Sequence, residues 1–240
     1  MNEIYKINYL DNLVFKLVKA KRLLSAIAIA SALSTASFQP VLAAEEDKGF
    51  YSTIGIGAHF PSDLTGDTTY WGPTYSGTEY HDGGFAGEIG LGYDWGNDWR
   101  MDFTYGKAWG EITKANYAGV NATLQGADYS VNFLKVGLNR DITFQNSSIK
   151  PYVGAGVGIG WSELSDFKLT LLDITFDGSG GTGDAKFIYN FKAGVAAPVS
   201  ERADLFGEVS YTADTGGTEQ QINYDPWGTI ALLGGIRVKF

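Results

Sequence analysis

The sequence predicts an all-β fold: an eight-stranded antiparallel transmembrane up-and-down β-barrel with an N-terminal cleavable signal peptide. Three observations carry this prediction. Apolar and polar residues alternate in eight segments, the last segment ends the chain in an aromatic residue, and the connections between segments alternate between short and long. Strand side chains point to opposite faces with period 2, so such alternation gives each strand one apolar and one polar face.

The C-terminal segment shows the pattern most clearly. Its apolar face carries Ile230, Leu232, Ile236, Val238 and Phe240. Its other face carries Thr229, Ala231, Gly235, Arg237 and Lys239. An apolar face that ends the chain in phenylalanine, backed by two cations, indicates a strand that meets lipid on one side and a polar barrel lumen on the other.

The eight segments are taken in chain order. They are Phe50 to Phe60, Phe85 to Trp95, Trp99 to Trp109, Tyr129 to Arg140, Ile149 to Trp161, Phe187 to Val195, Leu205 to Tyr211 and the C-terminal segment. Most approach the roughly 9–11 residues that a tilted strand needs to cross the hydrocarbon of a bilayer. In the fourth segment the outward apolar set changes phase, from Tyr129, Val131 and Phe133 to Leu134 and its successors. This change predicts a β-bulge near Phe133–Leu134.

The connections divide into two classes. Residues 96–98, 141–148 and 197–202 form short turns, whereas residues 61–83, 112–126, 162–184 and 213–226 form long loops. Short turns at one end and long loops at the other are typical of transmembrane barrels. Within the third long loop, Phe167 to Phe176 again begins in alternation, and turn residues follow from Gly178 to Gly183. A hairpin that projects beyond the membrane is therefore expected there.

The strand assignment gathers aromatic residues at both ends of the barrel. The outer group is Phe60, Phe85, Trp109, Tyr129, Trp161, Phe187, Tyr211 and Trp227, and the inner group is Phe50, Tyr93, Trp95, Trp99 and Phe240. Aromatic rings favour the two membrane interfaces, so two girdles support the assignment. Lys107 falls on the lipid side near the outer end and is expected to snorkel to the interface.

Residues 1–43 are predicted to be the signal peptide, and residues 44–240 the barrel domain. Four cations, Lys16, Lys19, Lys21 and Arg22, precede an apolar run from Leu23 to Leu33 that is too short to span a bilayer. Val41-Leu42-Ala43 then supplies a cleavage site of small or modest residues. A buried or membrane helix is the alternative, but the Ser, Thr and Pro residues that end the run disfavour it.

Composition excludes several classes of protein. The formal net charge is −9, and the predicted leader carries more bases than acids, so the barrel domain is more acidic still. No nucleic-acid partner is expected, since such binding normally needs a basic face. The chain has no cysteine, which excludes disulfides, thiolate metal sites and a lipid anchor on an N-terminal cysteine. No later apolar run has the length of a transmembrane helix, so membrane insertion requires a closed barrel.

Two motifs resemble a known family. The strand Lys150-Pro-Tyr-Val-Gly-Ala-Gly-Val-Gly-Ile-Gly160 is similar to the signature strand of the small Gram-negative outer-membrane barrels, which include opacity-type and OmpA-like proteins. Phe240, preceded by Ile236 and Val238, resembles the signal that barrel-assembly machinery recognises. The resemblance implies an outer-membrane location in a Gram-negative-type bacterium. Its implied partners are outer-membrane lipid and lipopolysaccharide, the assembly machinery during biogenesis, and an extracellular ligand that the outer loops could contact.

The predicted lumen carries most of the interpretable charge. Alternation points these polar residues inward: Glu88, Asp94, Arg100, Asp102, Asn132, Lys135, Lys150, Lys186, Asn190, Lys192, Asp204, Glu208, Arg237 and Lys239. Side chains just fill the interior of an eight-stranded barrel, and unpaired charges there are costly. We therefore expect a lumen charge network formed by Glu88, Asp102, Lys135, Lys192, Glu208 and Arg237. A narrow ion path lined by the same groups is the alternative.

Signals for catalysis and for cofactors are weak. The chain has two histidines, His59 with Ser62 nearby and His81 beside Asp82, and neither forms a recognisable catalytic motif. The glycines from Gly154 to Gly160 alternate strictly with apolar residues and do not form a phosphate loop, which needs a strand-to-helix turn. The outer loops are acidic, but the densest cluster, Asp177 to Asp184, lacks a calcium-loop spacing. No cofactor, metal site or catalytic residue is predicted.

The function predicted from these observations is that of a non-enzymatic outer-membrane β-barrel. Its polar lumen is plugged, its role is structural, and its surface-exposed loops are available for adhesion or ligand contact. Two alternatives stay open. One is a small porin that passes ions or small solutes, and the other is a lipid A-modifying barrel enzyme.

Overall fold

The computed structural model describes residues 48–69, 73–145, 147–219 and 222–240, and the elements in these ranges are all β-strands. The predicted signal peptide lies outside the described residues. No helix among the described residues is long and apolar enough to cross a membrane.

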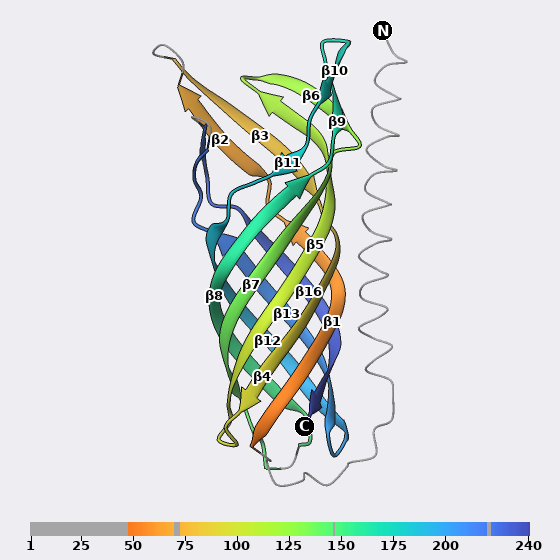
Figure 1. The fold of residues 1–240 in the computed structure, drawn as a ribbon, viewed down its shortest axis with the longest axis vertical. Helices are drawn as coiled ribbons and strands as arrows, with labels where there is room; N and C mark the ends of the chain where they lie inside the picture. Colours follow the sequence, from red (N-terminus) through yellow and green to blue (C-terminus); the bar gives the residue numbers. More distant parts are fainter. Residues whose placement is uncertain (1–47, 70–72, 146, 220–221) are drawn as a thin grey trace. The chain divides into compact units, whose positions relative to one another are not determined.

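Eight strands form a closed barrel, which confirms the predicted fold class (Figure 1). They are β1 (Gly49–Pro61), β4 (Gly84–Asp94), β5 (Trp99–Tyr117), β7 (Asp128–Asp141), β8 (Lys150–Leu164), β12 (Lys186–Ser200), β13 (Ala203–Asp214) and β16 (Gly228–Lys239). Each pairs antiparallel with the next of these strands along the chain. The pairing of β16 with β1, from Tyr51↔Lys239 to Pro61↔Thr229, closes the ring.

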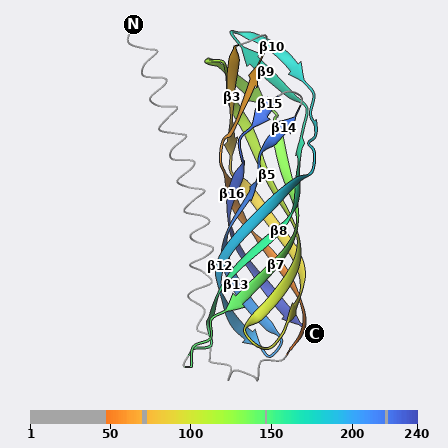
Figure 2. The same cartoon turned by 90° about the vertical axis from the view of Figure 1, so that its left-hand side faces the viewer.

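The long connections contain further paired strands. They are β2 (Leu64–Thr69), β3 (Thr74–Asp82), β6 (Val120–Gln125), β9 (Phe167–Leu171), β10 (Ile174–Gly178), β11 (Gly181–Thr182), β14 (Gly217–Glu219) and β15 (Ile222–Tyr224). Figures 1 and 2 show these strands at one end of the barrel, which we call the outer end. They join different connections, since β15 pairs with β2 and β6 pairs with β9. The expected loops are therefore an extension of the sheet.

The third long connection contains a projecting hairpin, but its turn differs from the prediction. Strands β9 and β10 pair across Leu172 and Asp173, whose φ values are 49° and 65°. Positive φ at both central residues is the geometry of the two-residue turns that match strand twist. The prediction of a turn at residues 178–183 is wrong, because Gly181 and Thr182 form strand β11, which pairs with the end of β8.

Exposure along the barrel strands follows the predicted alternation. Large apolar side chains such as Ile56, Leu91, Phe103, Val157 and Phe191 are more than half exposed on the outer surface. The inward positions between them hold glycine or side chains that are buried or partly buried. A continuous apolar exterior around a polar interior is the arrangement expected of a barrel surrounded by lipid.

Strand β7 contains no bulge, which contradicts the sequence prediction. Its register is continuous with β5, from Trp99↔Arg140 to Glu111↔Asp128, and continuous with β8. Tyr129, Val131 and Phe133 are buried inside the barrel. Leu134 and Val136 lie on the opposite face, where Leu134 is partly exposed and Val136 is exposed. The apolar residues change face because the surroundings change along the strand. The interior becomes apolar toward the outer end.

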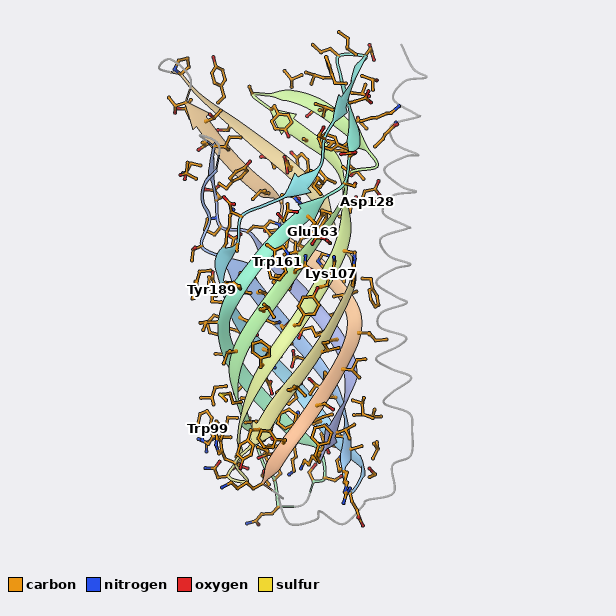
Figure 3. All side chains as sticks on the ribbon, in the orientation of Figure 1. Trp99, Lys107, Asp128, Trp161, Glu163 and Tyr189 are labelled. Atoms are coloured by element: carbon orange, nitrogen blue, oxygen red, sulfur yellow. The ribbon has the colours of Figure 1, made fainter. Side chains whose placement is uncertain are left out.

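This change of environment toward the outer end also corrects the predicted positions of three other residues. Asn132 was expected inside, but it pairs with Lys107 and Trp161 and shares their outward face. Tyr129 and Trp227 were expected in the outer aromatic girdle, but they are only 5% and 8% exposed and belong to the core. The remaining girdle residues are placed as expected. Figure 3 shows Trp161 toward the outer end and Trp99 near the opposite end.

Candidate functional site

The six predicted lumen residues all lie in the barrel interior and form three separate ion-pair groups. Lys135 Nζ lies 2.6 Å from Glu88 Oε1. Lys192 Nζ lies 2.9 Å from Asp102 Oδ2 and 3.6 Å from Glu208 Oε2. Arg237 pairs instead with Asp204, at 3.4 Å. We use the name lumen network for these residues together with the polar side chains that contact them.

Two tyrosines connect the Lys192 group with the Arg237 group. The Tyr51 hydroxyl donates a hydrogen bond to Asp102, and the Tyr152 hydroxyl donates one to Glu208 Oε2 at 2.9 Å. The guanidinium carbon of Arg237 lies 5.5 Å from the Tyr51 ring centre and 5.9 Å from that of Tyr152. A cation over an aromatic face within about 6 Å is attracted by the ring quadrupole. The tyrosines therefore bridge the acidic and basic members of the network.

A fourth ion-pair group, which is buried, lies nearer the end that carries the short turns. Arg100 is 2% exposed and binds both carboxylate oxygens of Asp141, through Nε at 2.8 Å and Nη2 at 2.7 Å. Its guanidinium also lies 5.2 Å from the Tyr152 ring centre. Asn139 donates to Asp102 Oδ2 at 2.6 Å. Bidentate pairing fixes the guanidinium plane and satisfies both acceptor oxygens.

Glycines on neighbouring strands make room for the tyrosines. A Cβ at Gly92 would overlap the Tyr51 ring, and a Cβ at Gly194 would meet the Tyr152 ring at 2.5 Å. Gly92 and Gly194 therefore leave the space that the two tyrosine rings fill. This packing leaves a cavity of only about 30 Å³ at the level of the network, lined in part by Lys192, Glu208 and Arg237.

An apolar cluster lies between this network and the outer end. It includes Ala86, Ala108, Phe133, Ile188, Ala231 and Leu233, all at most 8% exposed. Leu233 also lines the small cavity in the network, while Phe133 and Ile188 line a larger cavity toward the outer end. We call this cluster the apolar layer. Buried polar side chains such as His59 and Ser210, the register partners of Ala231, lie at the same level.

Sequence reasoning missed several members of the lumen network. Tyr51, Asn139 and Asp141 were not chosen, and Asp141 was expected in a turn. Strand periodicity contains the necessary signal, because Tyr51 shares the parity of inward Thr53 and Gly55, and Asn139 and Asp141 share that of inward Lys135. Alternation could not show which acid meets which base. That pairing depends on the strand order and tilt.

The two histidines make structural contacts. His59 is 1% exposed, with Nδ1 3.2 Å from Thr229 Oγ1 and Nε2 2.8 Å from the Trp109 carbonyl oxygen. Ser62, the nearest serine in sequence, instead accepts a hydrogen bond from Gly228 N at 3.1 Å. His81 was expected in a solvated loop, but it lies on β3, with its ring 4.9 Å from that of Tyr129. These contacts give no support to a catalytic arrangement.

A polar cluster lies on the outward face near the outer end. Lys107 was expected to snorkel, and it pairs with Glu163 at 3.0 Å (Figure 3). Glu163 also accepts hydrogen bonds from Ser130 and Asn132, both at 3.2 Å. Tyr105 donates to Asn132 Oδ1 at 2.8 Å. Lys107 is thereby neutralised on the outer surface instead of extending alone into the interface.

Phe240, the predicted assembly signal, is 73% exposed at the end opposite the long connections. Its backbone nitrogen donates to the Phe50 carbonyl oxygen at 3.0 Å, so the backbone is ordered while the ring stays accessible. Its role in assembly stays a prediction. Among the described residues, no group of three or more His, Cys, Asp or Glu side chains is arranged to hold a metal ion.

Comparisons with known proteins agree with this architecture. The family model described as outer membrane protein beta-barrel domain matches residues 28–233. The crystal structure of neisserial surface protein A, from Neisseria, is 20% identical, with a TM-score of 0.52; the match covers 80% of this chain and 97% of that one. The outer membrane protein OprG from Pseudomonas aeruginosa is 14% identical, with a TM-score of 0.50, and the match covers 82% and 99%. No curated protein sequence matches significantly.

Proposed function

The chain belongs to the outer membrane protein beta-barrel family, and from this premise we propose that it is a non-enzymatic outer-membrane barrel with a closed lumen. Its role is to hold the extended outer strands at the cell surface, where they contact a ligand or another surface. The single observation that carries the proposal is the filling of the lumen by two successive levels of side chains, the lumen network and the apolar layer.

Both levels oppose conduction. An ion would have to separate buried pairs such as Lys135–Glu88, and breaking one partner away from a buried pair costs about 3–5 kcal/mol. It would also have to pass the apolar layer, whose side chains cannot replace its hydration shell. Small eight-stranded barrels are generally filled by side chains, so this interior is the expected one for the strand number.

The outer strands present a structured surface with exposed apolar side chains. Leu172 is 77% exposed, and Ile174 and Phe176 are 58% and 51% exposed on the β9–β10 hairpin. Tyr75 and Tyr117 are also exposed, on β3 and the outer part of β5. Exposed apolar residues that cluster on a rigid scaffold commonly mark an interaction surface. These side chains support the contact role.

Single-channel recording on the refolded full chain in planar bilayers tests the closed lumen. The unmodified protein should give no steady conductance. Lys135→Ala, which removes one partner of a lumen pair, should produce brief openings, whereas the matched Lys107→Ala variant on the outward face should stay silent. Steady conductance from the unmodified protein would establish the small-porin alternative.

Incubation of the refolded protein with purified lipid A tests the non-enzymatic part of the proposal. Mass spectrometry should recover the lipid with its mass and acyl chains unchanged. A product that appears with the unmodified protein and disappears with both His59→Ala and His81→Ala variants would establish the lipid-modifying alternative.

A further inference from the structure

A cavity of about 200 Å³ lies between the apolar layer and the outer strands. We call it the outer cavity. Barrel strands β7, β8, β12 and β13 supply part of its wall, and β2, β3 and β15 supply side chains from the extended outer sheet. It lies outside the lumen network and contains none of the six residues that sequence analysis selected.

The wall of the outer cavity is mostly apolar. Ile112, Tyr129, Val131, Phe133, Ile188 and Trp227 all line it, and each is at most 9% exposed. Apolar cavities of about 150 Å³ remain dry and admit a molecule the size of benzene. At about 200 Å³, the outer cavity has room for one aromatic ring with a short substituent.

Trp227 contributes an unused hydrogen-bond donor. Its side chain lines the cavity and is 8% exposed, and its indole Nε1–H has no hydrogen-bond partner among the described residues. Leaving a buried donor unsatisfied costs about 1–3 kcal/mol. The backbone around it is fixed, because Trp227 N donates to Asp214 Oδ1 at 3.0 Å and Asp214 N donates to the Trp227 carbonyl at 2.9 Å. The donor is therefore held in place without a protein acceptor.

The other polar groups at the cavity disfavour an anionic ligand. Glu79, Asp184 and Asp214 outnumber Lys186. Burial lowers the pKa of His81, against the raising effect of nearby carboxylates, so its imidazole is neutral at pH 7. His81 Nδ1 lies 3.2 Å from the Glu79 carbonyl oxygen, which can only accept, so Nδ1 carries the proton. The cavity therefore has no unopposed positive charge.

We propose that the outer cavity binds a small uncharged molecule with one aromatic ring and one acceptor oxygen, and that this oxygen accepts the hydrogen bond of Trp227 Nε1–H. The rings of Tyr129, His81 and Trp227 surround the aromatic part, with centroids 4.9 Å apart for His81–Tyr129 and 6.2 Å apart for His81–Trp227. The proposal is independent of whether the lumen conducts and of whether the outer strands contact another surface.

Fluorine NMR on the full barrel in lipid nanodiscs tests the proposal, with acetophenone as the probe. The chain has six tryptophans, and 5-fluorotryptophan labels all of them. The Trp227 resonance, assigned by its loss in Trp227→Phe, should shift and reach saturation as acetophenone is added. Trp109, which is 42% exposed on the outward face and does not line the outer cavity, reports partition of the probe into lipid and should shift without saturation.

Two matched pairs of variants locate the site. Trp227→Phe keeps a ring but removes the donor, so acetophenone affinity, followed by ligand NMR, should fall by about threefold to tenfold. Trp109→Phe, outside the cavity wall, should leave the affinity unchanged. Val131→Phe enlarges a side chain in the cavity wall that is 9% exposed and should abolish saturable binding, whereas the matched Val157→Phe on the exposed face should preserve it.

Three results would overturn the proposal. No saturable shift at Trp227 would show that the cavity takes no such ligand. Equal affinities for acetophenone and ethylbenzene, which lacks the acceptor oxygen, would show that the hydrogen bond from Trp227 does not contribute to binding. Unchanged binding in a correctly folded Val131→Phe barrel would place the ligand elsewhere. Heat-dependent gel mobility checks folding, and if Val131→Phe does not fold, the comparison of Trp227→Phe with Trp109→Phe still decides.

Discussion

Lys192 and Asp102 meet across the barrel interior, with 2.9 Å between Nζ and Oδ2, although two strands separate them in the wall. Lys192 lies on β12 and Asp102 on β5, and the wall runs from β5 through β7 and β8 to β12. The contact therefore links distant parts of the barrel in a way that the backbone ladder alone does not. Lys192 also reaches Glu208 at 3.6 Å, so one cation serves two carboxylates.

Replacing Lys192 with methionine should destabilise the folded barrel by about 3–5 kcal/mol, because it leaves buried carboxylates without their cation. Urea unfolding of the refolded protein in lipid vesicles measures the change. Lys107→Met is the matched control, since it removes a lysine from an ion pair on the outward face that is partly exposed. That substitution should leave the unfolding midpoint nearly unchanged, because solvent screens an exposed ion pair. Equal effects of the two substitutions would contradict a special role for the cross-lumen contact.

The continuous register of β7 gives a second prediction. Val131 should face the outer cavity and Val136 should face lipid, although a bulge at Phe133–Leu134 would direct both outward. The chain has no cysteine, so Val131→Cys and Val136→Cys each give one site for a nitroxide label. Dissolved oxygen, which concentrates in lipid, should relax the label at position 136 strongly and the label at position 131 weakly. Strong relaxation at both positions would support the bulge at Phe133–Leu134 and contradict the continuous register.

This strand shows how far sequence reasoning could reach. Alternation identified the eight barrel strands and the inward charges, because period 2 is a local property of the backbone. It could not identify the environment that each face meets. Tyr129, Val131 and Phe133 were assigned to lipid because apolar residues were assumed to face outward, yet they line an apolar interior. Reading Asn132 together with Lys107 and Glu163 as an outward polar cluster would have indicated the change.

The outer strands were less predictable for a different reason. Short polar segments such as Leu64–Thr69 and Ile222–Tyr224 have weak alternation, and they form strands because they pair with each other across two connections. Their pairing follows from the barrel, which brings the ends of β1, β4, β13 and β16 together. Only Phe167–Leu171 had a local pattern strong enough to predict, and even there the turn was placed several residues too late.

The β9–β10 hairpin gives a third prediction. Replacing residues 167–178 with a short Gly/Ser turn should leave the barrel folded, because β9 pairs with β10 and β6 and neither hairpin strand pairs with a barrel strand. The variant keeps β11, which pairs with β8. Heat-dependent gel mobility and protease resistance should match those of the unmodified chain, while contact with a surface ligand should weaken. Loss of the folded barrel would show that the hairpin contributes to the wall.

The terminal phenylalanine gives the last prediction, which separates assembly in cells from intrinsic stability. Phe240 is 73% exposed and lies at the rim, so deleting it removes little buried area. Its deletion should reduce the amount of folded barrel in outer membranes several-fold, yet leave refolding into detergent micelles unchanged. Quantitative gel mobility of both preparations measures the two effects.

Phe50→Ala is the matched control for this deletion. Phe50 is 65% exposed at the same rim, contacts Tyr93 edge-on with ring centres 4.9 Å apart, and its carbonyl accepts the hydrogen bond from Phe240 N. If Phe240 acts only as an interfacial aromatic, the two changes should reduce insertion equally, since both remove one ring from the inner girdle. If the assembly machinery recognises Phe240, only the deletion of Phe240 should reduce insertion. A deletion that also prevents refolding in detergent would assign Phe240 to the stability of the barrel itself, because no assembly factor is present there.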